Sequence, residues 1–273
     1  MAHTTTALRL WYTMIYHFDE AGEGGCVEAG KTRRVHLMDE LRGVLIIGVV
    51  LYHLLYDLAV LFPVGIPWMF DPWMNHARNI CTGSLIVISG ISCLYSRSNL
   101  RRGLRTFGLG LLLSLVTGIF MPSQFILFGI LHFFGASMML YALLRPLLER
   151  IPAIPGIVGC VLLFCLTWNV YSGYVNILGY TLHLPDFLYN KPLLFPVGFA
   201  CRGLSSADYY PLLPWSFLFF AGSFFGRYVR AGKLPEFCYQ SHFPWLSRLG
   251  SHTLIIYLVH QPVIYGVLTL LFH

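Results

Sequence analysis

The sequence predicts an all-α integral membrane protein, a bundle of about seven transmembrane helices. Hydrophobic residues make up 56% of the 273-residue chain and charged residues only 11%, whereas a soluble domain carries about 25% charged residues. Mean hydropathy is +0.66. The apolar residues form long continuous runs, and a membrane β-barrel would instead alternate at period two. These observations exclude an ordinary soluble protein.

Each predicted span is an apolar run bounded by turn signals. A bilayer core of about 30 Å needs about 20 helical residues, and seven runs approach that length: residues 43–62, 78–95, 104–120, 125–144, 153–171, 212–228 and 252–271. We expect them to form a single transmembrane domain over 36–273. Residues 1–35 are polar and Gly-rich, lack the apolar core and cleavage site of a signal peptide, and are predicted to form a poorly ordered tail.

The distribution of Lys and Arg predicts the orientation. With the N-terminus in the cytoplasm and the C-terminus outside, 15 of the 18 basic residues fall on the inner side, as the positive-inside rule expects. Only Arg78, Lys191 and Arg202 are left outside. The net charge of +6 is therefore attributed to topology and not to nucleic acid, and the chain is predicted to be a multi-pass protein of the cytoplasmic membrane.

The seven cysteines form no CxxC pair and no zinc-ligand spacing. Most lie in apolar runs, where cysteine behaves as a small hydrophobic residue. We therefore expect neither a disulfide framework nor a metal site.

The first span, "MDELRGVLIIGVVLYHLLYDLAV", carries polar residues along one stripe. At 100° per residue, His53 lies about 20° from Arg42, and Asp39 and Asp57 both lie about 60° from it. Asp57 is one turn from His53, close enough for a hydrogen bond. Ionisable groups at this depth cost several kcal/mol unless they are paired or hydrated, so they favour a functional reading over a polar helix–helix contact.

Other spans place polar groups at a similar depth. His132 lies in "FGILHFFG", and "SHTLIIYLVHQPVIYG" carries Tyr257, His260 and Gln261. Asp208, Tyr209, Tyr210 and Trp215 lie around the start of the sixth run. Packed neutral histidines and an interfacial aromatic belt are the structural alternatives for these residues.

A histidine near the bilayer midplane, oriented by a carboxylate, is suited to act as a general base or a nucleophile. Arginine at the inner boundary recognises phosphate well, so a long phosphorylated ligand could enter from the cytoplasm. No GxGxxG or GxxxxGK[ST] motif marks a soluble nucleotide-binding fold. The residues alone are thus compatible with two interpretations, an acyl-transfer site and a proton relay.

Four segments, taken in order, resemble the heparan-alpha-glucosaminide N-acetyltransferase catalytic-domain family: "MDELRGVLIIGVVLYHLLYDL", "FGILHFFG", "ADYYPLLPWSFLFFAG" and "LGSHTLIIYLVHQPVI". The spacing Arg42-x10-His53 also resembles the motif of the acyltransferase-3 family. The resemblance implies a transmembrane acyltransferase that takes an acetyl group from cytosolic acetyl-CoA. The acceptor would be a hydroxyl or amine of an extracytoplasmic glycan or glycolipid.

On this reading His53 is the catalytic histidine, Asp57 fixes its tautomer, and His132 or His260 stabilises the oxyanion. Arg42 and Asp39 are expected on the donor side, and the acceptor is expected to meet Asp208, Tyr209, Tyr210, Trp215, Tyr257 and Gln261. Direct transfer and an acetyl-histidine intermediate both fit, and a homodimer is left open. The alternative is a proton-coupled transporter or flippase that uses the His and Asp residues as a relay.

Overall fold

The computed structural model describes residues 33–62, 64–177, 179–201 and 203–272. The predicted tail, 1–35, lies outside these residues except for its last three. The helices are α2 (His36–Val60), α3 (Pro72–Ser92), α4 (Asn99–Phe120), α5 (Ile130–Leu148), α6 (Ala153–Thr167), α7 (Leu212–Arg230), α8 (Pro244–Ser251) and α9 (Thr253–Phe272). The prediction of a mostly helical membrane protein is confirmed.

Six of the described helices are long and apolar enough to cross a membrane: α2, α3, α4, α5, α6 with the turn that follows it, and α9. The chain is therefore a multi-pass membrane protein. The predicted run 212–228 forms α7, which is not among these six. The count of seven spans and the orientation of the termini stay predictions.

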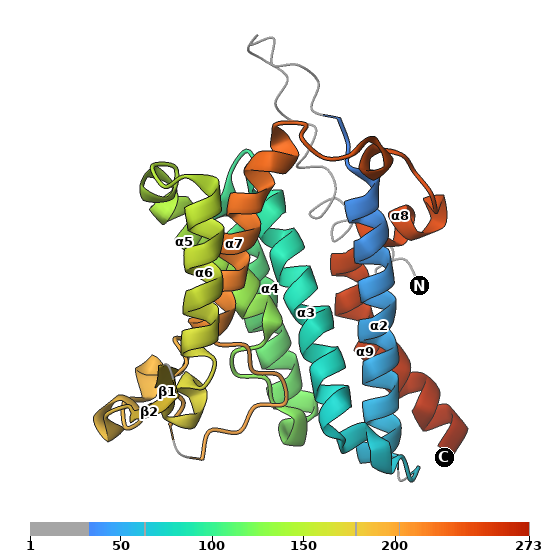
Figure 1. Cartoon of the computed structure of the whole chain (residues 1–273). Helices are drawn as coiled ribbons and strands as arrows, with labels where there is room; N and C mark the ends of the chain where they lie inside the picture. The colour runs from blue at the N-terminus through green and yellow to red at the C-terminus, as the bar shows by residue number, and fades with distance from the viewer. Residues whose placement is uncertain (1–32, 63, 178, 202, 273) are drawn as a thin grey trace. The chain divides into compact units, whose positions relative to one another are not determined.

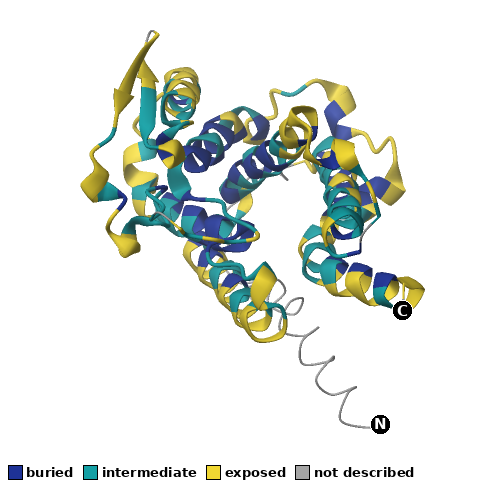
Figure 2. Cartoon of the chain, turned by 90° about the horizontal axis from the view of Figure 1, so that it is seen from below, coloured by how far each residue is buried: buried dark blue, intermediate teal, exposed yellow. Residues whose placement is uncertain are grey.

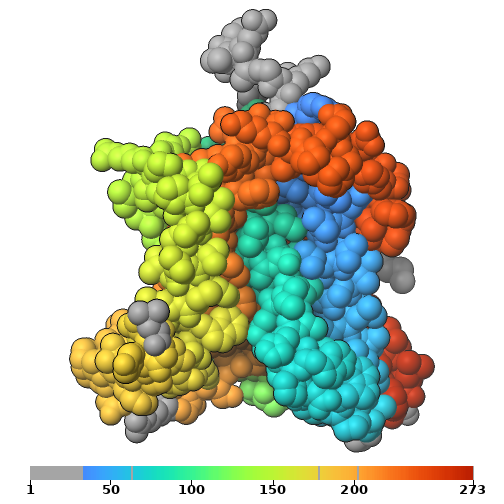
Figure 3. All heavy atoms as spheres, in the orientation of Figure 1, coloured from blue at the N-terminus to red at the C-terminus, as the bar shows by residue number. Residues whose placement is uncertain are grey.

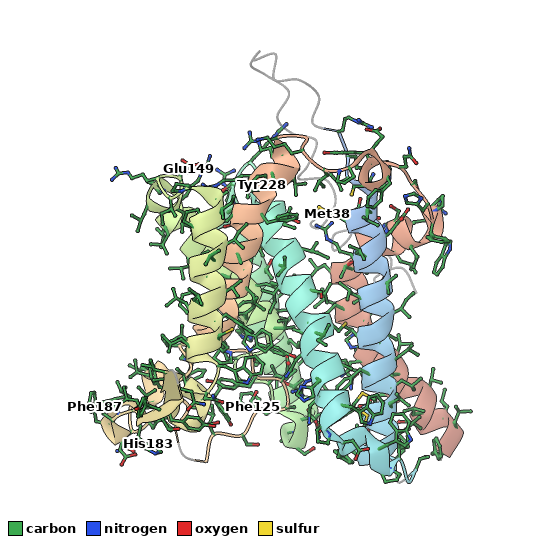
Figure 4. All side chains as sticks on the ribbon, viewed as in Figure 1. Met38, Phe125, Glu149, His183, Phe187 and Tyr228 are labelled. Atoms are coloured by element: carbon green, nitrogen blue, oxygen red, sulfur yellow. The ribbon has the colours of Figure 1, made fainter. Side chains whose placement is uncertain are left out.

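Successive long helices run in alternating directions within the 33–272 region (Figure 1). The start of α2 and the connections α3–α4 and α5–α6 therefore share one end, where Met38, Glu149 and Tyr228 are marked in Figure 4. This end, called the basic end below, carries most of the Arg-rich connecting segments. Phe125, His183 and Phe187 are marked near the opposite end.

Glycines allow α3 and α7 to pack backbone to backbone. A Cβ added at Gly90 would lie 2.0 Å from the Phe219 carbonyl oxygen, and one at Gly222 would lie 2.2 Å from that of Val87. Such close approach is a common use of small residues in membrane helices. The buried core lies around this contact and includes Ile86 of α3, Phe133 of α5 and Phe219 of α7. Figure 2 shows in dark blue that the buried residues gather on the inward faces of the helices.

Helix α2 packs against α3, α8 and α9. A Cβ at Gly250 of α8 would lie only 1.8 Å from the Asp39 carbonyl oxygen of α2. The buried Glu40 carboxylate accepts the backbone N–H groups of His242 and Phe243, both at 2.8 Å, just before α8. These contacts hold the 231–250 segment across the basic end, where Figure 3 shows it in orange beside the start of α2.

The 172–211 connection contains a structure that the sequence analysis does not predict. Strand β1 (Tyr174–Ile177) pairs antiparallel with β2 (Tyr180–His183), with Tyr174 opposite His183. Short 3-10 turns make up much of the remaining connections: Pro67–Phe70, Cys93–Tyr95, Pro122–Gln124, Val170–Ser172, Asp186–Leu188, Pro192–Leu194 and Glu236–Tyr239. A four-residue strand gives too few alternating positions to stand out beside long apolar runs.

Candidate active site

Helices α2 and α9 bring two of the predicted histidines together. The ring centroids of His53 and His260 lie 4.8 Å apart in an edge-on arrangement. The Nδ1–H of His260 donates to the Tyr257 carbonyl at 2.6 Å, because a carbonyl oxygen can only accept. The His260 Nε2 is buried and has no hydrogen-bond partner among the described residues. An unpartnered ring nitrogen beside a second imidazole is a place where a proton could be held or passed.

The carboxylate of Asp57 has a different partner from the one that helical spacing predicts. Asp57 is 1% exposed, and its two oxygens accept from the Gln261 amide nitrogen at 2.9 and 3.0 Å. The expected Asp57–His53 hydrogen bond is not among the contacts of the described residues. Gln261 follows His260 directly in α9, so the Asp57–Gln261 pair joins the two helices that carry the histidines.

Asp208 connects α9 to the start of α5. Its Oδ2 accepts the Ile130 backbone N–H at 2.9 Å, and it also receives a hydrogen bond from the Tyr257 hydroxyl. Gly129 leaves room for this carboxylate, since a Cβ there would lie 2.4 Å from Asp208 Oδ2. Burial raises the pKa of the Asp208 carboxyl to about 6, although the N–H of Ile130 opposes that shift.

Tyr210 adds α3 to the same group of polar side chains. Its hydroxyl lies 3.2 Å from Thr82 Oγ1, and its backbone N–H donates to the Phe128 carbonyl at 2.9 Å. Burial raises the pKa of Tyr210 to about 12, so the phenol stays protonated near neutral pH. His53, His260, Tyr257, Asp208 and Tyr210 are thus linked through contacts of α2, α9, α3 and the segment before α7.

Arg78 also belongs to this group, although sequence reasoning did not select it. Its guanidinium carbon lies 6.0 Å from the centroid of the Tyr52 ring, and Tyr52 meets His53 edge-on at 5.7 Å. Arg78 interacts electrostatically with His53 and Asp208. The sequence feature that could have identified Arg78 is its place among the three basic residues that the positive-inside rule leaves on the outer side.

Tyr209 and Trp215 face other parts of the structure. The Tyr209 hydroxyl donates to the Phe195 carbonyl at 2.5 Å. Trp215 is buried in the core, where its ring packs against Phe164 and Trp168 and touches Tyr210. The Tyr209 hydroxyl and the Trp215 ring are thus engaged in these contacts, and Trp215 meets the site through Tyr210.

His132 lies in a separate environment between α4 and α5. It is 2% exposed, stacks on Phe128 and meets Phe107 edge-on. Its Nε2 lies 3.4 Å from Ser114 Oγ, and its Nδ1 has no partner among the described residues. The contacts of His132 do not include His53 or His260, so the structure does not assemble the three histidines into one cluster.

Arg42 and Asp39 form a pair at the basic end. The Arg42 guanidinium donates to Asp39 Oδ1 at 2.8 Å and also to the Ser92 hydroxyl. Asp39 also binds Arg34 at 2.9 Å. By the rise of an α-helix, Arg42 and His53 are about 16 Å apart along α2, so the two ends of the predicted stripe are distinct places.

In the part of the chain that the structure describes, no three His, Cys, Asp or Glu side chains come together as a candidate metal site. The site consists of imidazoles, hydroxyls, the carboxyls of Asp57 and Asp208 and one arginine, which suits proton transfer and hydrogen bonding.

A family model described as "Heparan-alpha-glucosaminide N-acetyltransferase, catalytic" matches residues 34–262. The chain belongs to this family. The match covers most of the chain and includes every predicted site residue. No curated protein and no solved structure matches the chain.

Membership identifies the chain as a membrane enzyme of the acetyltransferase type. The polar cluster around His53 and His260 lies inside the matched region, on helices long and apolar enough to cross a bilayer. Groups that carry or accept charge at such depth are typically retained for function.

Proposed function

We propose that the chain transfers an acetyl group from cytosolic acetyl-CoA to a hydroxyl or amine of an extracytoplasmic glycan or glycolipid. It would act in the cytoplasmic membrane, with the basic end in the cytoplasm. The observation that carries the proposal is the contact between His53 and His260, with the buried Nε2 of His260 left without a partner.

In this proposal His53 accepts the proton of the acceptor hydroxyl or amine as that group attacks the thioester carbonyl. The C–S bond then breaks, CoA leaves as the thiol after protonation, and the acetyl group stays on the acceptor. His260 would share the proton; this is supported by its unpartnered Nε2 and by the 4.8 Å between its ring centroid and that of His53. A two-step route, with the acetyl group first on His53, uses the same residues.

The donor is assigned to the basic end. Arg42 and Arg34 offer guanidinium groups on either side of Asp39, and arginine binds phosphate through paired N–H donors. A long donor would lie along α2, with its phosphates at Arg42 and its thioester near His53. Replacing Arg42 with Gln should raise the KM for acetyl-CoA about 10-fold or more, as expected for a lost charge-assisted hydrogen bond.

The test is CoA release from acetyl-CoA by the purified chain in lipid nanodiscs, with glycan amines as acceptors. His53→Ala is compared with His183→Ala, a histidine on the exposed strand β2. We expect CoA release to fall at least 100-fold in His53→Ala only, while acetyl-CoA binding is retained by both. Wild-type turnover in a folded His53→Ala sample would refute the assignment, and absence of acetyl-CoA binding by the wild type would refute the donor.

A further inference from the structure

Arg78 occupies the edge of the candidate active site on α3. Arg78 and Thr82 are one helical turn apart and therefore lie on the same face, and Thr82 contacts the Tyr210 hydroxyl. On the α2 side, Arg78 lies over the ring of Tyr52, which touches His53. The Arg78 guanidinium thus lies over Tyr52, the neighbour of His53 on α2. Through Thr82 of its own helix it is also close to Tyr210, in the segment that carries Asp208.

The charge of Arg78 has no carboxylate partner among the described residues. Ion pairs there join Arg33 to Glu236, Arg34 and Arg42 to Asp39, and Arg145 to Glu149. The hydrogen bond found for Arg78 is a long one, 3.5 Å to the side chain of its neighbour Asn79. The nearby Asp208 instead uses its carboxylate for Ile130 and Tyr257.

Topology does not account for an arginine in this position. Arg78 lies toward the start of α3, at the end of the helices opposite the basic end (Figure 1). Basic residues that direct membrane orientation gather on the other side. Its side chain is exposed, so its planar fork of N–H donors is available to a ligand that reaches the histidines from that end.

We propose that Arg78 is a specificity-determining residue that binds an anionic group, a phosphate or a carboxylate, on the acceptor. The inference rests on the proposed function, since it concerns the acceptor of that reaction. The anionic group is held at Arg78, and the hydroxyl or amine of the same molecule then faces His53. Guanidinium binds such groups through two parallel hydrogen bonds, which fix orientation as well as affinity.

The test compares two acceptors that differ by one anionic group, glucosamine and glucosamine 6-phosphate, with acetyl-CoA as donor. Wild type, Arg78→Gln and Arg78→Lys are assayed in nanodiscs beside Lys191→Gln, which removes an exposed positive charge from the 172–211 connection. We expect Arg78→Gln to raise the KM for glucosamine 6-phosphate about 10- to 100-fold and that for glucosamine less than 2-fold. Arg78→Lys should be intermediate, and Lys191→Gln should match the wild type.

Equal effects of Arg78→Gln on both acceptors, or no effect, would overturn the inference while the wild-type CoA release still supports the proposed function. Failure of the wild type to release CoA with either acceptor would overturn both. The assay is run in nanodiscs of phosphatidylcholine and again with phosphatidylglycerol. An Arg78→Gln effect that follows the lipid and not the acceptor would assign the arginine to lipid headgroups and refute the acceptor role.

Discussion

Replacing Gln261 with Leu removes both hydrogen bonds from a buried carboxylate. Asp57 is 1% exposed, and the Gln261 amide lies 2.9 and 3.0 Å from its two oxygens. A hydrogen bond to a charged group contributes about 1.5–3 kcal/mol, and a buried group left without its partner also loses the compensation for its desolvation. We therefore expect Gln261→Leu to lower the free energy of unfolding by about 3 kcal/mol.

For a domain of this size, a loss of about 3 kcal/mol corresponds to a Tm decrease of roughly 6–12 °C. The pair joins α2 to α9, so its loss should also weaken the His53–His260 contact and reduce CoA release. Replacing both residues, Asp57→Leu with Gln261→Leu, removes the unpaired carboxylate. The double variant should then regain most of the lost stability, because removing both partners of a buried pair is nearly neutral.

The assay is thermal unfolding in detergent of the wild type, both single variants and the double variant, with CoA release measured on each. A coupling energy of about 2 kcal/mol or more is expected from the cycle. Additive single effects, or a Gln261→Leu variant that melts with the wild type, would refute the structural role of the pair. A double variant that is stable but inactive would show that Asp57 takes part in the chemistry.

Two further predictions concern Asp208, at the end of the helices opposite the basic end, and Gly250, at the basic end. The folded-state pKa of Asp208, about 6, exceeds its ordinary value of 3.8, so the folded protein binds the proton more tightly; stability should fall as pH rises from about 4 to about 6, by up to about 3 kcal/mol. The Tm of Asp208→Asn should not show this fall with rising pH. A variant whose Tm falls with pH as the wild type does would contradict the assignment of the effect to Asp208. Gly250→Ala should cost about 1–3 kcal/mol, since its Cβ would meet the Asp39 carbonyl oxygen at 1.8 Å. Gly159→Ala, where nothing lies within 4 Å, is the control and should melt at or slightly above the wild-type temperature, since alanine is favoured over glycine inside a helix.

The sequence was sufficient to predict the long helices of the fold but not α8 or the β1–β2 hairpin. Several residues that it singled out, such as His53 and His260, lie together in the candidate site. Apolar run length identifies membrane helices directly, because the bilayer requires both length and an internally satisfied backbone. Each of the seven predicted runs overlaps a helix of the structure. The ordered motifs also predicted the family that the comparison confirms.

Sequence alone determined which residues share a face of one helix, such as Arg42, His53 and Asp57 on α2, since helical periodicity is local. Which helix lies across from that face depends on packing, and the tertiary structure decided it. In the tertiary structure Asp57 accepts a hydrogen bond from Gln261 and not from His53, His260 lies beside His53, and His132 lies between α4 and α5. It also placed Arg78 over Tyr52, the neighbour of His53. The sequence assigned this arginine only to one side of the membrane, because the neighbours of a side chain are decided when the helices pack.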